Sequence, residues 1–343
     1  MADLANSTFA STVPGVIWIV VMTYICYRGI EVSARLQYAL LGIELVVLLA
    51  FAVVALLKVY TGTAESYSIT PSLDWFWPAG LDFSTVIAPA ILTAIFIYWG
   101  WDTAVACNEE SDDPGRTPGR AAVISTCLLL ATYALVSVSV IAFARVGDEG
   151  VGLGNQEDAD DVFAAVGHDL FGDSVLGKIA LMLLAASILT SASASTQTTI
   201  LPTARTTLSM GVYKALPASF AKIHRTYLTP TTSRIAMGAV SVLFYLLFTL
   251  ISPNLLTALI GSVGLMIAFY YGLTGFACVW FYRKHLTTSL RDFMMRGVVP
   301  LASGIALTAV FVYGLIQYAK PDWLTDDQGK NVTILGFGAV AVV

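Results

Sequence analysis

Charged residues are scarce in this chain, and the common catalytic signatures are missing from it. Only 12% of the 343 residues are Asp, Glu, Lys or Arg, whereas 57% are hydrophobic, and the mean hydropathy is +0.77. Charged residues make up about a quarter of an average soluble domain, so the composition excludes an ordinary soluble fold. No HExxH, GxSxG or Walker A lysine loop occurs, and these absences argue against a membrane-embedded enzyme.

Cysteine and histidine are also few, and their spacing is not that of a metal site. The four cysteines lie in or at the ends of apolar runs, and the three histidines form no metal motif. No disulfide framework, metal site or bound cofactor is expected from this pattern.

Long charge-free runs are what the chain does contain. A helix needs about 20 apolar residues to cross roughly 30 Å of hydrocarbon. The run 235–282 carries no charge and is too long for one helix, so we expect the Ser-Pro-Asn turn at 252–254 to divide it. We predict an all-α polytopic membrane protein, a single transmembrane domain over 1–343 with about nine membrane helices, the last incomplete. The expected spans are 8–27, 36–57, 83–107, 121–144, 176–204, 235–251, 255–282, 297–319 and a partial span at 331–343.

Alternate loops differ in charge. The loops 28–35, 108–120, 205–234 and 283–296 hold 13 of the 18 Lys and Arg residues. Positively charged loops stay on the cytoplasmic side, so we expect these four loops in the cytoplasm of a multi-pass protein of the cell (plasma) membrane. The first span then enters from outside, which suggests that an odd number of helices once preceded it. The acidic stretch 148–173 is expected to be a solvated external loop.

The segment FIYWGWDT, residues 96–103, places a glycine and an acid inside a membrane-length apolar run. No charge lies between Asp82 and Asp102. A carboxylate in such a span is costly unless it faces protein, water or a ligand. Non-helical backbone at membrane depth survives only where it is buried in protein or lines a cavity. We therefore expect the helix to open near Gly100 and to form the substrate region of a transporter.

Three segments resemble the amino acid–polyamine–organocation (APC) permeases. FIYWGWDT with the following NEESDDPGRTPGRAAVIS resembles the family's sixth helix and next loop. The stretch 200–230, ILPTARTTLSMGVYKALPASFAKIHRTYLTP, resembles its eighth helix and loop, and YRGIEVSARLQ, 27–37, the turn between its fourth and fifth helices. The matching residues of the first segment are Gly100, Asp102, Glu109, Glu110, Pro114, Arg116, Pro118 and Arg120.

The resemblance covers nearly the whole chain and implies a fold. APC permeases have a five-plus-five inverted repeat (LeuT-type) whose first and sixth helices are broken at the midplane. The first span here corresponds to the family's fourth helix, so the chain would be a partial bundle lacking about three N-terminal helices and the end of the last helix.

Candidate site residues follow from the segment 96–103 and from polar groups within the spans. Substrate binding is expected at Phe96, Ile97, Tyr98, Trp99, Gly100 and Trp101, through freed backbone groups and aromatic faces. Asp102 and Glu44 are candidates for proton coupling or gating. The resemblance implies a lysine or a sodium site where Glu44 stands, and neither fits a glutamate there. Thr190, Ser191 and Ser262 could offer hydroxyls to a cation or solute. Each of these residues has an alternative structural role in helix packing or hydrogen bonding.

The expected function is secondary active transport of an amino acid or related amine, driven by a proton or sodium gradient or by exchange. The alternatives are a non-transporting fragment or partner subunit of such a permease and, with less support, a membrane-embedded enzyme. The expected partners are the solute and the lipid bilayer, with no nucleic acid. The sequence identifies neither the solute nor the oligomeric state.

Overall fold

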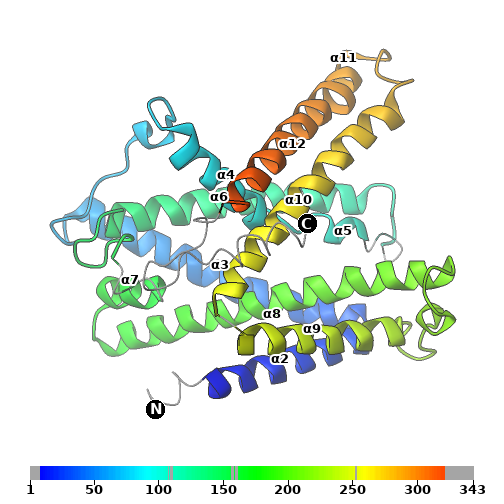
Figure 1. Ribbon diagram of the computed structural model, residues 1–343. Helices are drawn as coiled ribbons and strands as arrows, with labels where there is room; N and C mark the ends of the chain where they lie inside the picture. Colours follow the sequence, from blue (N-terminus) through cyan, green and yellow to red (C-terminus); the bar gives the residue numbers. More distant parts are fainter. Residues whose placement is uncertain are drawn as a thin grey trace. The chain divides into compact units, whose positions relative to one another are not determined.

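The computed structural model (Figure 1) describes residues 8–106, 108, 111–155, 158, 161–251 and 253–320. Over these residues the regular structure is helical, apart from one isolated antiparallel bridge between Ile223 and Pro230. The expected all-α class is confirmed for this part of the chain. The chain divides into two compact units, the first formed by Met1–Pro78 and Gly100–Leu243 and the second by Ala79–Trp99 and Phe244–Val343.

The first unit is built around α3, which contacts α2, α6, α7 and α8. Its helices are α2 (Thr8–Arg28), α3 (Ile30–Thr61), the 3-10 turn η1 (Leu73–Phe76), α5 (Thr103–Ala106), α6 (Thr117–Ala144), α7 (Val162–Phe171), α8 (Val175–Val212), the 3-10 turn η5 (Ala218–Ala221) and the first part of α9 (Thr231–Ile251). A short break separates α2 from α3 at Gly29, whose φ is 128°. Glycine adopts this backbone conformation without a Cβ penalty, so the helix direction can change here.

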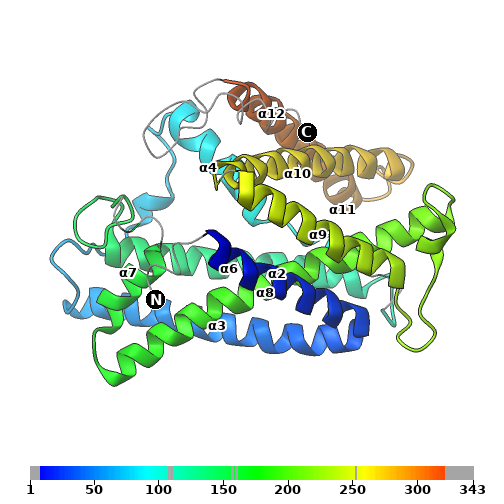
Figure 2. The ribbon, with the colours of Figure 1, turned by 60° about the horizontal axis from the view of Figure 1, so that its bottom comes forward.

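The second unit is a smaller bundle in which α10 lies alongside α12, as both views show (Figures 1 and 2). Its elements are the π turn η2 (Phe83–Ile87), α4 (Ala88–Ile97), the end of α9, α10 (Pro253–Tyr282), α11 (Leu290–Asp292), the π turn η6 (Phe293–Val298) and α12 (Val299–Tyr318). Glycines allow α10 and α12 to approach closely. A Cβ on Gly275 would lie 2.6 Å from the Pro300 carbonyl oxygen, and one on Gly304 would lie 3.1 Å from that of Gly272.

Several helices have the length and hydropathy of a membrane crossing. Among the residues that the structure describes, five ranges qualify: Ile30–Thr61, Thr117–Ala144, Val175–Val212, Ser262–Tyr282 and Leu290–Tyr318. Shorter apolar helices cover Thr12–Arg28, Val162–Phe171 and Thr231–Leu247. The chain is thus an integral membrane protein, while the count of about nine membrane helices and the inverted repeat stay predictions. The partial span expected at 331–343 lies outside the described residues.

The apolar core of the first unit includes part of the stretch that we expected to be an external loop. Phe51 of α3, Phe143 of α6 and Leu170 of α7 are at most 1% exposed. Within the acidic stretch 148–173, the Asp161 side chain accepts a 3.0 Å hydrogen bond from the Ala164 N–H and begins α7. The expectation of a fully solvated loop was therefore wrong for α7, because its apolar residues share one helical face that packs against α3 and α8.

Candidate functional site

Regular helix stops within the segment FIYWGWDT. The last residue of α4 is Ile97, and α5 starts only at Thr103. Between them, the Trp99 N–H donates to the Phe96 carbonyl three residues back, at 3.2 Å, rather than four residues back. Gly100 has a φ of +116°, and a Cβ placed on it would meet nothing within 4 Å. The glycine is therefore required by the backbone conformation and not by a lack of space.

The side chains of this segment lie on both sides of the break. Phe96 to Trp99 belong to the second unit, and Gly100 to Asp102 belong to the first. Ile97 and Trp99 are 44% and 39% exposed, while the Phe96, Tyr98, Trp101 and Asp102 side chains are half-buried. The Trp99 indole Nε1 donates a 2.7 Å hydrogen bond to the Tyr270 hydroxyl on α10. This bond holds the end of α4 against α10.

The structure brings together Glu44 and Ser191, two candidates that sequence reasoning treated separately. Glu44 is half-buried on α3, and its carboxyl group lies close to the Ser191 side chain on α8. The neighbouring Thr190 hydroxyl instead donates to the Ser187 carbonyl of its own helix, at 2.8 Å. An acid within an apolar helix needs such a polar partner. The pair forms a polar contact between two membrane helices.

Ser262, the remaining hydroxyl candidate, is fully buried on α10 in the second unit. Glu109 and Glu110, which belong to the resemblance, lie outside the described residues, as does Cys107. Among the residues that the structure describes, no group of three or more His, Cys, Asp or Glu side chains could hold a metal ion.

Two buried arginines were missed by sequence reasoning. Arg205 is 9% exposed and Arg234 is completely buried, yet the sequence placed both in a basic loop, 205–234. The helix α8 continues to Val212 and α9 starts at Thr231, so both arginines are helical. In the sequence, a charged residue at the edge of an apolar run indicates the start of a loop. The observed ends of α8 and α9 show instead that both arginines belong to helices.

Another missed contact joins α2 to α8. The Trp18 indole Nε1 donates a 3.0 Å hydrogen bond to the Ser193 hydroxyl, which itself donates to the Leu189 carbonyl at 2.6 Å. No spacing in the sequence pairs these two side chains. Tryptophans in membrane helices also commonly lie at the lipid interface, so the residue type alone did not indicate a contact between helices.

Comparison with known proteins gives a consistent result. The amino acid permease family model matches residues 2–340. The uncharacterized transporter Mb2022c of Mycobacterium bovis and the uncharacterized transporter Rv1999c of Mycobacterium tuberculosis are each 27% identical to this chain over 328 residues. These alignments cover 94% of this chain and 63% of each relative, so the chain spans less than two thirds of their length. The resemblance to the APC permeases is confirmed, and the chain belongs to the amino acid permease family.

Proposed function

We propose that this chain acts as a secondary active permease that carries an amino acid or a related amine across the cell membrane. The break between α4 and α5 is the observation that supports this proposal best. It interrupts an apolar helix of a permease-family protein at a glycine whose φ is +116°. Membership in that family also supports a transporter rather than an enzyme.

The end of α4 suits the amino group that amino acids and amines share. Carbonyl groups at the C-terminal end of a helix carry partial negative charge and attract cations. The aromatic side chains Phe96, Tyr98 and Trp99 stand at this end of α4. Aromatic faces also attract ammonium groups, by about 0.5–2 kcal/mol depending on desolvation. We assign these residues, with Ile97, Gly100 and Trp101, to solute contact.

Coupling to a gradient is assigned to the carboxyl groups within or beside the helices. Glu44, the carboxyl group that lies beside Ser191 on α8, is the first group assigned to carry a coupling proton. Asp102 lies at the start of α5, where its backbone carbonyl accepts from the Ala106 N–H at 2.8 Å. Proton coupling or exchange is the mode that we propose. Sodium coupling through Thr190, Ser191 or Ser262 is the competing mode.

We further propose that the helices form part of a LeuT-type bundle with the Lys/Arg-rich loops in the cytoplasm of a plasma-membrane protein. Alternating access would then occur by rocking of helices around the broken segment.

The test is uptake into proteoliposomes that contain the 343-residue chain. Pools of radiolabelled neutral amino acids, cationic amino acids and polyamines are offered with an inward proton gradient, with an inward sodium gradient and with internal unlabelled solute. We expect uptake of one pool above empty liposomes with the proton gradient or with internal solute. Uptake that requires sodium would contradict the coupling assignment, and no uptake of any pool would contradict the permease proposal for this chain.

Gly100→Ala tests the role of the break. An L-residue at this φ is strained by roughly 1 kcal/mol or more, so the geometry of the segment should change and uptake should fall. The matched control is Gly42→Ala, because a Cβ on Gly42, inside α3, meets nothing within 4 Å and its φ is not positive. Equal uptake by both variants would argue against a solute site at the break.

A further inference from the structure

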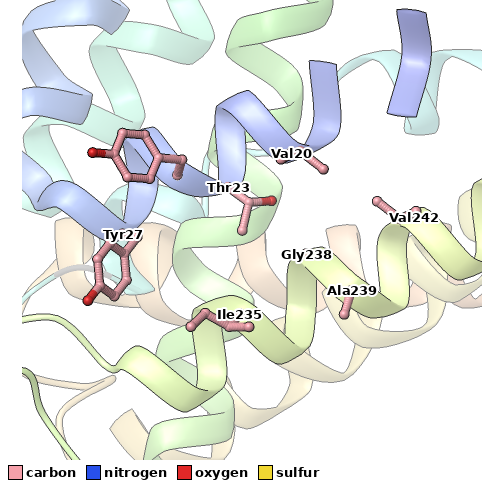
Figure 3. Close-up of a pocket in the computed structure, with 8 residues that line it drawn as sticks. Val20, Thr23, Tyr27, Ile235, Gly238, Ala239 and Val242 are labelled. Carbon is pink, nitrogen blue, oxygen red and sulfur yellow. The ribbon is translucent and has the colours of Figure 1, made fainter. Parts of the chain in front are cut away.

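A groove of about 580 Å³ lies between α2 and α9 in the first unit (Figure 3). Val20, Thr23 and Tyr24 line it from α2, and Gly238, Ala239 and Val242 line it from α9. Figure 3 shows the two helices side by side with Thr23 facing Gly238. A Cβ on Gly238 would clash with the Thr23 side chain. The two helices therefore touch at this point, and the groove runs along their contact.

The groove offers almost no polar groups to an occupant. The Thr23 hydroxyl donates to the Ile19 carbonyl of its own helix at 2.7 Å. The remaining lining is aliphatic and aromatic carbon apart from the hydroxyl groups of Tyr24 and Tyr27. An amino acid zwitterion would lose its hydration here without compensation. The lining instead suits a hydrocarbon chain.

A cation stands at the end of α2 beside this groove. Arg28 is exposed, and its guanidinium lies over the rings of Tyr24 and Tyr227, 5.9 Å and 5.2 Å from their centroids. One of its nitrogens donates a 3.1 Å hydrogen bond to the hydroxyl of Tyr24, a residue that lines the groove. The guanidinium carries five N–H donors in a fixed fork. It is thus held by aromatic rings, with donors available to a further acceptor.

The charge of Arg28 has no protein counterion in the described part of the chain. The nearest acid in sequence, Glu31, forms its ion pair with Arg35 one turn further along α3. No carboxylate of the described residues lies within 4.0 Å of the Arg28 guanidinium nitrogens. An apolar groove with an unneutralised arginine at its end is complementary to a molecule that joins an acyl chain to an anion.

We propose that the groove between α2 and α9 binds an anionic phospholipid, with one acyl chain along the groove and its phosphate on Arg28. From Val20 to Tyr27 the helix rises by about 10 Å, enough to hold part of one acyl chain. Arg28 follows directly, at the end of the apolar helix where a headgroup lies. Guanidinium groups bind phosphate through paired hydrogen bonds.

The charge at Arg28 decides the selectivity of this site. An acyl chain gains little by moving from the bilayer into an apolar groove, because both surroundings are hydrocarbon. Juxtamembrane basic residues favour anionic lipids by about 1 kcal/mol each, equivalent to roughly a fivefold preference. A zwitterionic lipid has the same acyl chains but carries its own compensating ammonium group. Binding should therefore discriminate by headgroup.

The experiment measures lipid retained by the purified chain. The protein is reconstituted in nanodiscs of phosphatidylglycerol and phosphatidylcholine in equal amounts and released into the gas phase for native mass spectrometry. We expect one phosphatidylglycerol adduct to be preferred by roughly fivefold or more. Arg28→Gln should remove the preference, and Ala239→Trp, which fills the groove, should remove the adduct. Added inorganic phosphate should not compete.

Two matched variants control for general effects. Arg35→Gln removes an exposed arginine that is already paired with Glu31, and Ala302→Trp adds the same bulk to an exposed position on α12. Both should retain the adduct and the preference. Monodisperse elution and an unchanged helical circular dichroism signal establish folding for each variant.

Other results would overturn the proposal. A preference that survives Arg28→Gln, or an adduct that survives Ala239→Trp, would place the lipid elsewhere on the protein. Two chains per particle in the wild type but one in Ala239→Trp would assign the groove to a second copy of the chain. This inference does not rest on the proposed transport function, since the adduct is measured without a solute.

Discussion

Glu44 on α3 lies close to Ser191 on α8, so that a carboxyl group within a long apolar helix has a polar neighbour on another membrane helix. A carboxyl group in hydrocarbon is unfavourable unless it is paired. The pairing itself is compatible with a purely structural role. An experiment can separate a role of Glu44 in proton coupling from a purely structural role, because only proton coupling requires its carboxyl group to gain and lose a proton.

Glu44→Gln keeps a polar side chain of the same size beside Ser191 but cannot titrate. If Glu44 carries the coupling proton, uptake driven by a pH gradient should fall on the order of tenfold, while solute exchange at equal pH continues. The measurement is proteoliposome uptake in both modes. Ser191→Ala keeps the titrating group and is the matched variant. An equal loss in both modes for Glu44→Gln would indicate a structural role.

The hydrogen bond from Trp99 to Tyr270 should contribute to the stability of the second unit. Trp99→Phe and Tyr270→Phe each remove one partner of this 2.7 Å bond. Such a bond contributes about 1 kcal/mol net. A double-mutant cycle, measured as free energies of unfolding in mixed micelles, should give a coupling energy of about that size. If the effects of the two substitutions on the free energy of unfolding are strictly additive, the hydrogen bond does not contribute to stability in the micelles.

Because its pKa is raised in the folded protein, Tyr67 should make the protein less stable at alkaline pH. Its hydroxyl donates a 3.1 Å hydrogen bond to Asp169 Oδ2 in α7, and burial together with the nearby Asp169 charge raises the pKa of Tyr67 above its usual value. The folded state then holds a proton that the unfolded state loses above about pH 10. This stability is present below about pH 10 and is lost as the pH rises through the folded-state pKa.

The measurement for Tyr67 is the melting temperature in detergent at about pH 8 and about pH 11. Other tyrosines titrate in every variant, so the comparison is with Tyr67→Phe, which lacks the titrating group. The wild type should lose more stability on going to alkaline pH than Tyr67→Phe does. Identical losses would mean that the pKa of Tyr67 differs little between the folded and unfolded states.

Close packing of α10 on α12 depends on Gly275. Its missing Cβ would lie 2.6 Å from the Pro300 carbonyl oxygen, a backbone atom that cannot move aside independently. Gly275→Ala should destabilise the protein by about 1–3 kcal/mol through overpacking, with a lower melting temperature. The control is Gly119→Ala in α6, because a Cβ there meets nothing within 4 Å. Equal melting temperatures would indicate that the two helices can separate at no cost.

Hydropathy and charge were enough to predict the class of the fold. The charge-free run 235–282 was expected to divide near the Ser-Pro-Asn turn, and the described helices α9 and α10 end and begin on either side of residue 252. The glycine in FIYWGWDT was expected to open its helix, and α4 ends three residues before it. Both features are local, since they depend on neighbouring residue types and on backbone preferences.

The loops were predicted less accurately than the apolar spans, and the reason is physical. Arg205 and Arg234 looked like loop residues because charge is unfavourable in a membrane helix, yet both are helical and buried. The segment of α7 looked solvated because acids surround it, yet its apolar face packs in the core. Average composition over a window does not reveal which face of a helix meets protein.

The sequence by itself determined which segments leave water and where one of them cannot stay helical, because these properties follow from transfer free energies and from glycine's conformational range. Only the tertiary structure decided that Glu44 meets Ser191, that Trp99 meets Tyr270 and that Thr23 meets Gly238. Such pairs depend on the rotation and axial position of each helix against its neighbour, and these are set by packing across the whole interface.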